Sequence, residues 1–364
     1  MKKSILKLVL LSSPFLLAIG VELFVLPIDY FTFRPLEALV IKQFDNILPG
    51  RFYPNMTLIR EEEGDLGHHT KYALKRTIEW TTDSYGYRKK GPSRPRYEVV
   101  IIGQSETFGG GLTQKEMLSE VLEGRLTLGV YPLAPTSVNT FLKERRFIRH
   151  PPEIVIVTCM GWGVFYLPPP KMSLMKKRIS NGTVQNMIEM IQENRRIQSV
   201  FVFLDRLYKM NMFRYLRTTL RRMFSERQET ALNLADTKFG PILFLQGAKA
   251  NKDVPKEKLD QVVQTIKSYD DLFKSRGIRF IFLPIPEKEN IFYESLGTQR
   301  PVFWEQLVAR LKELGIETVD VPRAFEEEYR KNSTLLYLPD DTHWNPRAVQ
   351  LAADLTARVI ERKK

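Results

Sequence analysis

The stretch that decides the fold of this chain reads VVIIGQSETFGGG and covers residues 99–111. Its first four residues are apolar and mostly β-branched, and the run is short enough for a buried strand. A glycine-rich loop follows, and Thr113 is a typical N-cap for the helix expected after it. A buried strand that leads through a tight loop into a helix indicates a βαβ unit with parallel strands.

The same alternation of short apolar strands and amphipathic helices continues outward from this stretch. Because strands that alternate with helices form parallel sheets through right-handed crossovers, the pattern predicts an α/β domain. We expect a three-layer, flavodoxin-like fold with a mostly parallel sheet. The further strands are expected at 130–131, 154–157, 242–245, 278–283 and 317–320, and the further helices at 137–149, 256–274, 304–314 and 346–361.

Composition excludes several classes of protein. Of the 364 residues, 43% are hydrophobic and 27% are charged, which is typical of globular chains and excludes wholesale disorder. The single cysteine, Cys159, excludes a disulfide framework and a thiolate zinc site. His68 and His69 are adjacent and would not share a face of a helix, so we predict no metal site and no cofactor.

The net charge of +13 fits an anionic partner, such as a membrane surface or a polyanionic glycan. One carrier of this charge is the segment 201–227, where arginines and apolar residues alternate at helical spacing. A solvated helix face is the equally strong alternative for that segment. A nucleic-acid binder rests on charge alone, and the amino terminus argues against it, so we expect no nucleic-acid partner.

The amino terminus has the pattern of a membrane anchor. Lys2, Lys3 and Lys7 precede the apolar run LVLLSSPFLLAIGVELFVLPI at 8–28. As a helix this run would span about 30 Å, the thickness of a hydrocarbon core, and the lysines would keep its start cytoplasmic. A cleaved signal peptide and a buried helix are the alternatives. The expected segments are a signal-anchor transmembrane helix at 1–28, a linker and lead-in at 29–95, and an α/β domain at 96–364 with a basic insertion at 165–238.

Two segments far apart in the chain together favour nucleophilic catalysis. Ser105 follows a buried strand, at the edge of the sheet where open α/β folds bind ligands. A serine needs a base, and His343 precedes the last helix in PDDTHWNPRA, with Asp340 and Asp341 just upstream. A carboxylate bonded to one imidazole nitrogen leaves the other free to accept the serine proton. A serine after a strand is more often a turn residue, and a histidine near an aspartate is more often a surface residue. The two together are a far more specific sign of a catalytic site.

These two segments resemble the first and last motif blocks of the SGNH (GDSL-type) hydrolase superfamily, in its extracytoplasmic branch of alginate O-acetyltransferase-type proteins. The resemblance implies Ser105 as nucleophile and His343 as base. The acid is Asp340 if the spacing is DxxH, and Asp341 in the DTHW form, which we prefer. The segments DSYGYR, before the first strand, and PIPEKENIFY, after a late strand, resemble softer features of the same branch.

The resemblance also implies where the oxyanion donors lie. Gly103, Ala134 and Gly161 stand at or near the block positions that supply such donors in the family. The chain departs from the family pattern, since Gln104 replaces the aspartate of GDS and the third block lacks its asparagine. Trp344, beside His343, is expected either to stack on a sugar or to pack against the last helix.

The function that the resemblance implies is an extracytoplasmic serine hydrolase or O-acetyltransferase that acts on acyl esters of a cell-surface or exported polysaccharide. It implies two partners, a carbohydrate acceptor or acetylated glycan and a multi-span membrane acyl-transfer protein. The expected location is the bacterial inner membrane, single-pass, with a periplasmic or extracellular carboxyl-terminal domain. The alternative is a catalytically degenerate SGNH-fold subunit that binds glycan or assembles a polysaccharide-modification complex.

Overall fold

The computed structural model describes residues 2–45, 47–91, 94, 96–174, 182–224 and 233–362, and its centre is a parallel sheet of four strands. The strand order is β4-β3-β5-β8, and a parallel bridge between Phe282 and Thr318 adds the start of a further strand beyond β8. This arrangement confirms the predicted α/β fold with its parallel sheet. The bounds are β3 (Val99–Ile102), β4 (Val130–Leu133), β5 (Ile154–Met160) and β8 (Arg279–Ile285).

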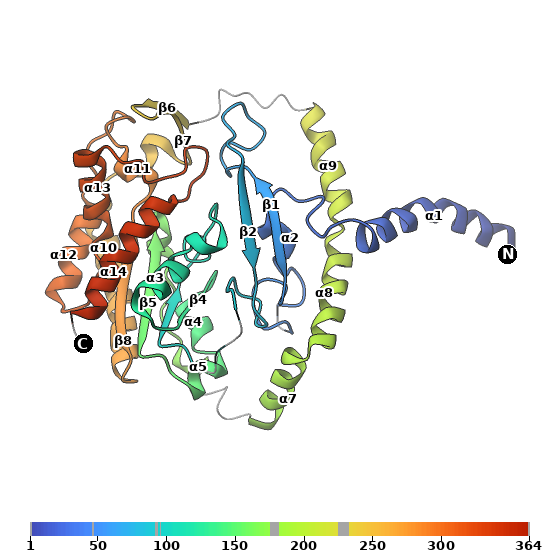
Figure 1. The fold of residues 1–364 in the computed structure, drawn as a ribbon, viewed down its shortest axis with the longest axis horizontal. Coiled ribbons are helices and arrows are strands. Elements are labelled where there is room, and N and C mark those ends of the chain that lie inside the picture. The colour runs from blue at the N-terminus through green and yellow to red at the C-terminus, as the bar shows by residue number, and fades with distance from the viewer. Residues whose placement is uncertain are drawn as a thin grey trace.

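Helices cover both faces of this sheet (Figure 1). Alternate side chains of β3 enter two separate cores, because successive residues of a strand point to opposite faces: Val99 and Ile101 to one, Val100 and Ile102 to the other. The first core is closed by α3 (Leu118–Leu126), α13 (Val321–Asn332) and α14 (Pro346–Glu361). The second is closed by α10 (Lys256–Lys274), α12 (Phe303–Glu313) and the short helices α4 (Val138–Phe141) and α5 (Arg145–Arg149).

The segment 29–95, expected as a linker and lead-in, carries structure of its own in its described part. It contains the short helix α2 (Pro35–Leu39) and an antiparallel hairpin of β1 (Thr57–Glu62) and β2 (Arg76–Thr81). Phe52 and Trp80 of this segment pack in a third core together with Phe108, which belongs to the glycine-rich loop after β3. The hairpin is therefore bound to the edge of the sheet at which Ser105 lies.

The predicted insertion at 165–238 forms a run of helices on the far side of the hairpin from the sheet (Figure 1). They are α7 (Gly182–Glu193), α8 (Arg195–Lys209) and α9 (Asn211–Phe224). The helical spacing at 201–227 is confirmed over most of the segment, but Met210 adopts a left-handed conformation with φ 42° and divides it between α8 and α9. The last three residues of that predicted helix, 225–227, lie outside the described residues.

Two further predictions need correction. The expected strand at 242–245 belongs to β7 (Gly240–Phe244), which pairs with β6 (Asn233–Thr237) in a separate hairpin instead of joining the sheet. The main chain of Leu243 instead bonds to Pro339 and to the side chain of Lys288, so its hydrogen bonds are satisfied there. The expected helix at 137–149 is divided into α4 and α5.

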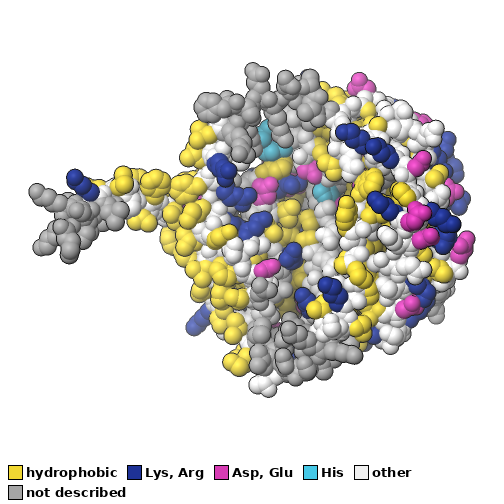
Figure 2. All heavy atoms as spheres, turned by 180° about the vertical axis from the view of Figure 1, so that it is seen from behind, with side chains coloured by type: hydrophobic (Ala, Val, Ile, Leu, Met, Phe, Trp, Pro, Cys, Tyr) yellow, Lys and Arg dark blue, Asp and Glu magenta, His cyan; other side chains and the backbone are white. Residues whose placement is uncertain are grey.

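The apolar amino-terminal run forms α1 (Lys2–Phe24), which projects from the body of the molecule, with hydrophobic side chains along it (Figures 1 and 2). Its carboxyl-terminal part packs on α8 and α9, and the Glu22 carboxylate accepts hydrogen bonds from the N–H groups of Asn211 (2.8 Å) and Met212 (3.0 Å). In the described part of the chain, no helix has both the length and the apolar character needed to cross a bilayer. The predicted transmembrane helix at 1–28 is therefore not supported.

Candidate active site

Ser105 lies two residues beyond Gly103, the residue that follows β3, at the carboxyl edge of the sheet. Gly103 is required there by packing, since a side-chain carbon on it would lie 2.0 Å from Thr158 Oγ1 and 2.1 Å from Thr107 Oγ1. Ser105 is partly exposed and lines a cavity of about 360 Å³ together with Gly103 and Thr342. Its hydroxyl donates a hydrogen bond to Oε1 of Glu106 at 2.9 Å.

His343 lies in the loop that leads into α14, and the side chain of Asn345 caps that helix. Nδ1 of His343 bonds to Oδ1 of Asp341 at 2.5 Å, and the main-chain N–H of His343 donates to the same oxygen at 3.0 Å. These two bonds fix the orientation of the imidazole and leave Nε2 as the nitrogen available for proton transfer.

The imidazole packs against the turn that begins at Ser105. A side-chain carbon on Gly110 would lie 2.6 Å from Nε2 of His343, and the N–H of Gly110 donates to the carbonyl oxygen of Ser105 at 2.8 Å. The structure therefore brings together the two segments that the sequence analysis paired. Among the described residues, however, no hydrogen bond joins Ser105 to His343 directly, because the hydroxyl is directed at Glu106.

The two candidate acids have different surroundings. Asp341 is the residue bonded to His343, and its second oxygen accepts bonds from the Asp65 N–H (3.0 Å) and Arg76 (3.2 Å). Asp340 instead accepts the N–H groups of Gly64 and Leu74, each at 2.8 Å, and bonds to Arg76. Asp340 thus secures the connection between β1 and β2, whereas Asp341 contacts the imidazole.

The charges around His343 favour its protonated form. Burial alone would lower the pKa of His343, but the charge and hydrogen bond of Asp341 outweigh it, with smaller contributions from Glu106 and Asp65, and raise the pKa to about 9. Burial likewise opposes ionisation of Asp341, yet its pairing with His343 holds the pKa of Asp341 well below its usual value. At neutral pH the resting pair is therefore an imidazolium and a carboxylate.

Lys288 is a buried cation that holds the histidine loop, residues 338–343. Sequence reasoning missed this role. Its side chain is 1% exposed, and its ammonium group donates to the carbonyl oxygens of Leu338 (2.6 Å), Asp341 (2.5 Å) and Leu243 (2.9 Å). Burial lowers the pKa of Lys288 to about 8. The only signal in the sequence was the segment PIPEKENIFY, whose lysine gives no sign of burial by itself.

Arg88 holds the glycine-rich loop that follows Ser105 in a similar way. It is fully buried and stacks over the ring of Trp80, with 4.0 Å from Cζ to the ring centroid. Its guanidinium donates to the carbonyl oxygens of Phe108 (3.0 Å), Gly109 (2.6 Å) and Leu112 (2.7 Å). The arginine of DSYGYR therefore fixes the glycine-rich loop against which His343 packs.

Of the other predicted site residues, some lie at the Ser105 cavity and some lie elsewhere in the structure. Gly103 lines the cavity beside Ser105, but Ala134 is buried in the third core. Gly161 has φ 46° and packs on Glu287, where a side-chain carbon would lie 2.0 Å from the carboxylate oxygen. Trp344 is fully buried beside Phe325, so it packs with the last helices and presents no face to a sugar.

Two carboxylic acids line the cavity near Ser105. Glu106 is buried and holds the Ser105 hydroxyl, and Glu287 accepts the N–H of Trp162 at 3.1 Å. Burial raises the pKa of Glu287 to about 7, with the charges of Glu289 and Glu106 adding to the effect and the Trp162 bond opposing it. The cavity therefore favours a neutral group, such as an acyl ester, over an anion.

Comparison with known proteins bears on the region that contains this histidine loop. Residues 243–364 match the family model described as "SGNH hydrolase-like domain, acetyltransferase AlgX". This part of the chain is similar to an SGNH hydrolase-like domain. The matched range contains His343 and both candidate acids, and Ser105 lies outside it.

Two individual proteins are similar to parts of the chain. "Probable alginate O-acetylase AlgJ" of Pseudomonas putida is 23% identical over 103 residues, which is 27% of this chain and about a quarter (26%) of that relative's length. A solved structure described as that of a G-D-S-L family lipolytic protein from Desulfitobacterium hafniense covers 73% of this chain and 99% of its own, at 14% identity and a TM-score of 0.33.

Proposed function

We propose that this chain is a serine acyl-ester enzyme, an O-acetyltransferase or an acetylesterase, that acts on O-acetyl groups of a polysaccharide. The observation that carries the proposal is the placement of His343, which is bonded to Asp341 through Nδ1 and packed through Nε2 on the turn that begins at Ser105. The names of the matched family and of the AlgJ relative, an acetyltransferase and an O-acetylase, support this reaction class.

The proposed reaction proceeds in two transfers. Neutral His343 takes the hydroxyl proton of Ser105 as Oγ attacks the acetyl carbon, and the imidazolium then gives this proton to the departing oxygen. The result is an acetyl-serine ester and an alcohol. A sugar hydroxyl or water then attacks this ester by the same route in reverse, which regenerates Ser105. Main-chain N–H groups of the Ser105 turn are the proposed donors to the oxyanion.

For this chemistry the Ser105 hydroxyl must turn from Glu106 toward His343. A rotation about χ1 is sufficient for a serine, because its three staggered positions differ little in energy at a partly exposed site. We propose that bound substrate favours this rotation by placing the ester carbonyl in the cavity. Asp341 is the proposed acid of the triad, and the domain that contains it is proposed to begin near residue 96.

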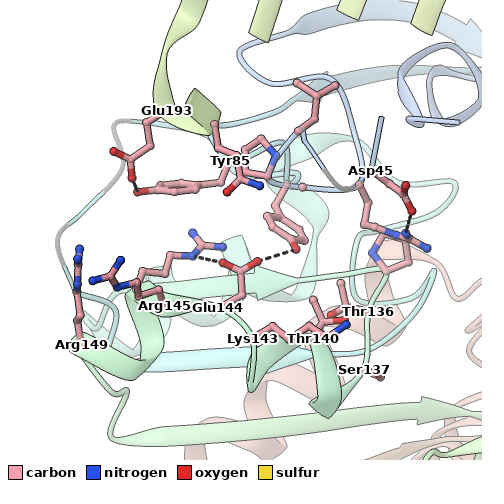
Figure 3. A pocket seen from close by; sticks show the side chains of 18 of the residues that line it. Asp45, Tyr85, Thr136, Ser137, Thr140, Lys143, Glu144, Arg145, Arg149 and Glu193 are labelled. Atoms are coloured by element: carbon pink, nitrogen blue, oxygen red, sulfur yellow. Dashed lines mark hydrogen bonds and ion pairs between the residues drawn. The ribbon is translucent and has the colours of Figure 1, made fainter. Parts of the chain in front are cut away.

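A second, larger cavity adjoins the first and fits a glycan chain. It measures about 700 Å³ and shares Gln104, Thr136 and Ser137 with the cavity of Ser105. Figure 3 shows Lys143, Arg145 and Arg149 on its wall with Glu144 between them. Cations outnumber acids among the residues that line it, so the proposed occupant is a polysaccharide with negatively charged groups. The proposal includes a location outside the cytoplasm and an acyl-supplying partner protein, both of which rest on the resemblance.

The direct test is the Ser105→Ala variant. We expect acetyl release from a small acetyl-ester reporter, or acetyl transfer to an oligosaccharide, to fall by about 10³-fold or more. Ser275→Ala, at the exposed end of α10, is the matched control and should keep full activity. Unchanged turnover in Ser105→Ala would contradict the mechanism, and the thermal midpoint of both variants checks that they are folded.

Two observations favour the alternative, a glycan-binding subunit without catalysis. The Ser105 hydroxyl is bonded to Glu106, and the family's asparagine donor is missing from the third block. This alternative predicts that Ser105→Ala retains both glycan binding and polysaccharide acetylation in cells. The enzyme proposal predicts retained glycan binding but lost acetylation, so measuring both quantities on one variant separates the two.

A further inference from the structure

Three side chains with metal-ligating atoms meet in the connection between β1 and β2, away from Ser105. They are Glu63, His68 and His69, and one carboxylate oxygen and one ring nitrogen from each histidine lie within 4.8 Å of one another. Nδ1 of His68 is 2.9 Å from Oε2 of Glu63. Two imidazoles and one carboxylate form a donor set that Zn²⁺ uses in proteins.

The backbone brings the two adjacent histidines together. Because neighbouring residues of a helix do not share a face, the adjacency of His68 and His69 in the sequence predicted no metal site here. The structure has a turn instead, in which His69 adopts the left-handed conformation with φ 64°. This conformation is uncommon for a residue other than glycine. It places the two rings 3.4 Å apart between centroids, and the ring of Phe33 stacks on His68 at the same distance.

The turn is held in place by bonds that do not involve the histidine rings. The N–H of Gly64 donates to the side chain of Asp340 and the N–H of Gly67 to its carbonyl oxygen, each at 2.8 Å. The N–H of His68 donates to the carbonyl oxygen of Gly64 at 3.0 Å. The ligating side chains therefore project from a fixed segment, which reduces the entropy lost when a ligand is bound.

The spacing requires only a small adjustment to bind a metal ion. Ligand atoms that lie about 2.0–2.1 Å from a tetrahedral zinc ion are about 3.4 Å from one another. The three ligand atoms here are at most 4.8 Å apart. Side-chain rotations that move each atom by about an ångström would bring them to the roughly 3.4 Å separation of zinc ligands. Glu63 and both histidines also line a cavity of about 480 Å³, which leaves room for water at a fourth position.

We propose that Glu63, His68 and His69 bind a divalent cation of the zinc type, at a site separate from Ser105 and His343. The bound ion would tie the start of the β1–β2 connection to its middle. That connection also presents Asp65, which bonds to Thr342 at 2.9 Å and 2.7 Å and to Asp341 at 3.0 Å. Occupancy of the site is thus expected to stiffen the loop that surrounds the catalytic acid.

The chain contains four histidines, so single substitutions can locate the ion. The chain of residues 1–364 is treated with a chelator, dialysed and titrated with ZnCl₂ by calorimetry, and bound zinc is counted by elemental analysis. Wild type is expected to bind one equivalent. His68→Ala and His69→Ala should each lose at least tenfold in affinity, whereas His150→Ala and His343→Ala should bind as wild type does. Because protons compete for imidazole, binding should weaken below about pH 6.

Three results would overturn the proposal. The first is that folded wild-type protein binds no zinc, and the second is that all four histidine variants bind zinc equally. Loss of binding only in His343→Ala would place the ion at the other described group with this spacing, Asp65, Asp341 and His343. The thermal midpoint of each zinc-free variant guards against misfolding, and added zinc should raise the midpoint of wild type and His150→Ala but not of His68→Ala. MgCl₂ serves as the probe for an oxygen-preferring cation and should not displace zinc.

Discussion

Nε2 of His343 lies so close to Gly110 that a single side-chain carbon on that glycine would stand 2.6 Å from it. Carbon and nitrogen atoms without a bond between them do not approach to that distance, so any other residue at this position displaces the ring. The glycine is therefore part of the histidine's binding surface, and it links the serine turn to the base.

This contact predicts that Gly110→Ala lowers activity while the fold is kept. The methyl group pushes His343 from the Ser105 turn, and we expect a fall in kcat of about 10²-fold, as for other ångström-scale misplacements of a catalytic group. Gly124→Ala is the matched control, because a side-chain carbon there meets nothing within 4 Å. Since Gly124 lies inside α3, that change should stabilise the protein by about 0.5–1 kcal/mol. Equal activity of the two variants would show that His343 does not act through this contact.

The charge state of His343 predicts the pH dependence of catalysis. The base must be neutral, and its pKa is raised to about 9, so kcat/KM should rise with pH until about pH 9. Stability should change in the opposite direction. A pKa raised above its unfolded value stabilises the folded state fully below about pH 6.5, and this contribution is lost as pH rises to about 9. The measurements are a pH–rate profile and urea unfolding at several pH values.

Glu106 is expected to shift that profile. Its charge contributes to the raised pKa of His343, and its carboxylate holds the Ser105 hydroxyl. Glu106→Gln should therefore move the rising limb of kcat/KM to lower pH. Glu313→Gln, on an exposed side chain, should leave the profile unchanged. A Glu106→Gln profile that overlays the wild-type profile would remove Glu106 from the electrostatics of the site.

Substitution of the two neighbouring aspartates, Asp340 and Asp341, should have different effects. Asp341→Asn removes the charge bonded to Nδ1, so we expect the His343 pKa, followed by NMR, to fall and kcat to drop by about 10³–10⁴-fold. Asp340→Asn leaves that bond in place but weakens the attachment of the β1–β2 connection, so it should mainly lower stability. A larger fall of the His343 pKa in Asp340→Asn would reverse the assignment of the acid.

Lys288→Met should destabilise the protein and disturb the base together. Hydrogen bonds from a charged donor contribute about 1.5–3 kcal/mol each, and this change leaves three or more carbonyl oxygens without their donor. We expect a loss of at least about 3 kcal/mol in urea unfolding, with an altered His343 pKa in the folded protein. Lys90→Met, on an exposed side chain, should cost less than about 1 kcal/mol.

The fold could be predicted because its strands are continuous apolar runs. A run such as 99–102 has no polar face, so it must be buried on both sides, and its alternation with helices leaves few topologies. The strand at 242–245 shows where this reasoning fails. Its apolar residues require burial but do not specify which strand they pair with. In the structure the main chain of Leu243 bonds to the carbonyl oxygen of Pro339 and to the side chain of Lys288, and the strand does not join the parallel sheet.

The sequence was enough to propose Ser105 and His343 as the candidate pair, but it did not indicate the residues that hold their loops in place. Ser105 and His343 stand out because their neighbours in sequence form known motif blocks. Lys288 and Arg88 do not stand out, because a cation becomes an internal donor only when several main-chain carbonyls converge on it in three dimensions. The turn at His69 was missed for a related reason, since a left-handed conformation at a histidine has no signature in the sequence.

The bond between the Asp65 N–H and the Asp341 carboxylate joins residues 276 positions apart, and Arg76 adds a second bond of the same kind. A fragment that starts at the first strand of the parallel sheet would keep serine, histidine and aspartate but lose these donors. Its carboxylate would accept fewer hydrogen bonds, and its histidine would titrate differently. The amino-terminal hairpin thus influences the pKa of His343, and under the proposed function divergence in that hairpin would alter the working pH even where the serine, histidine and aspartate are unchanged.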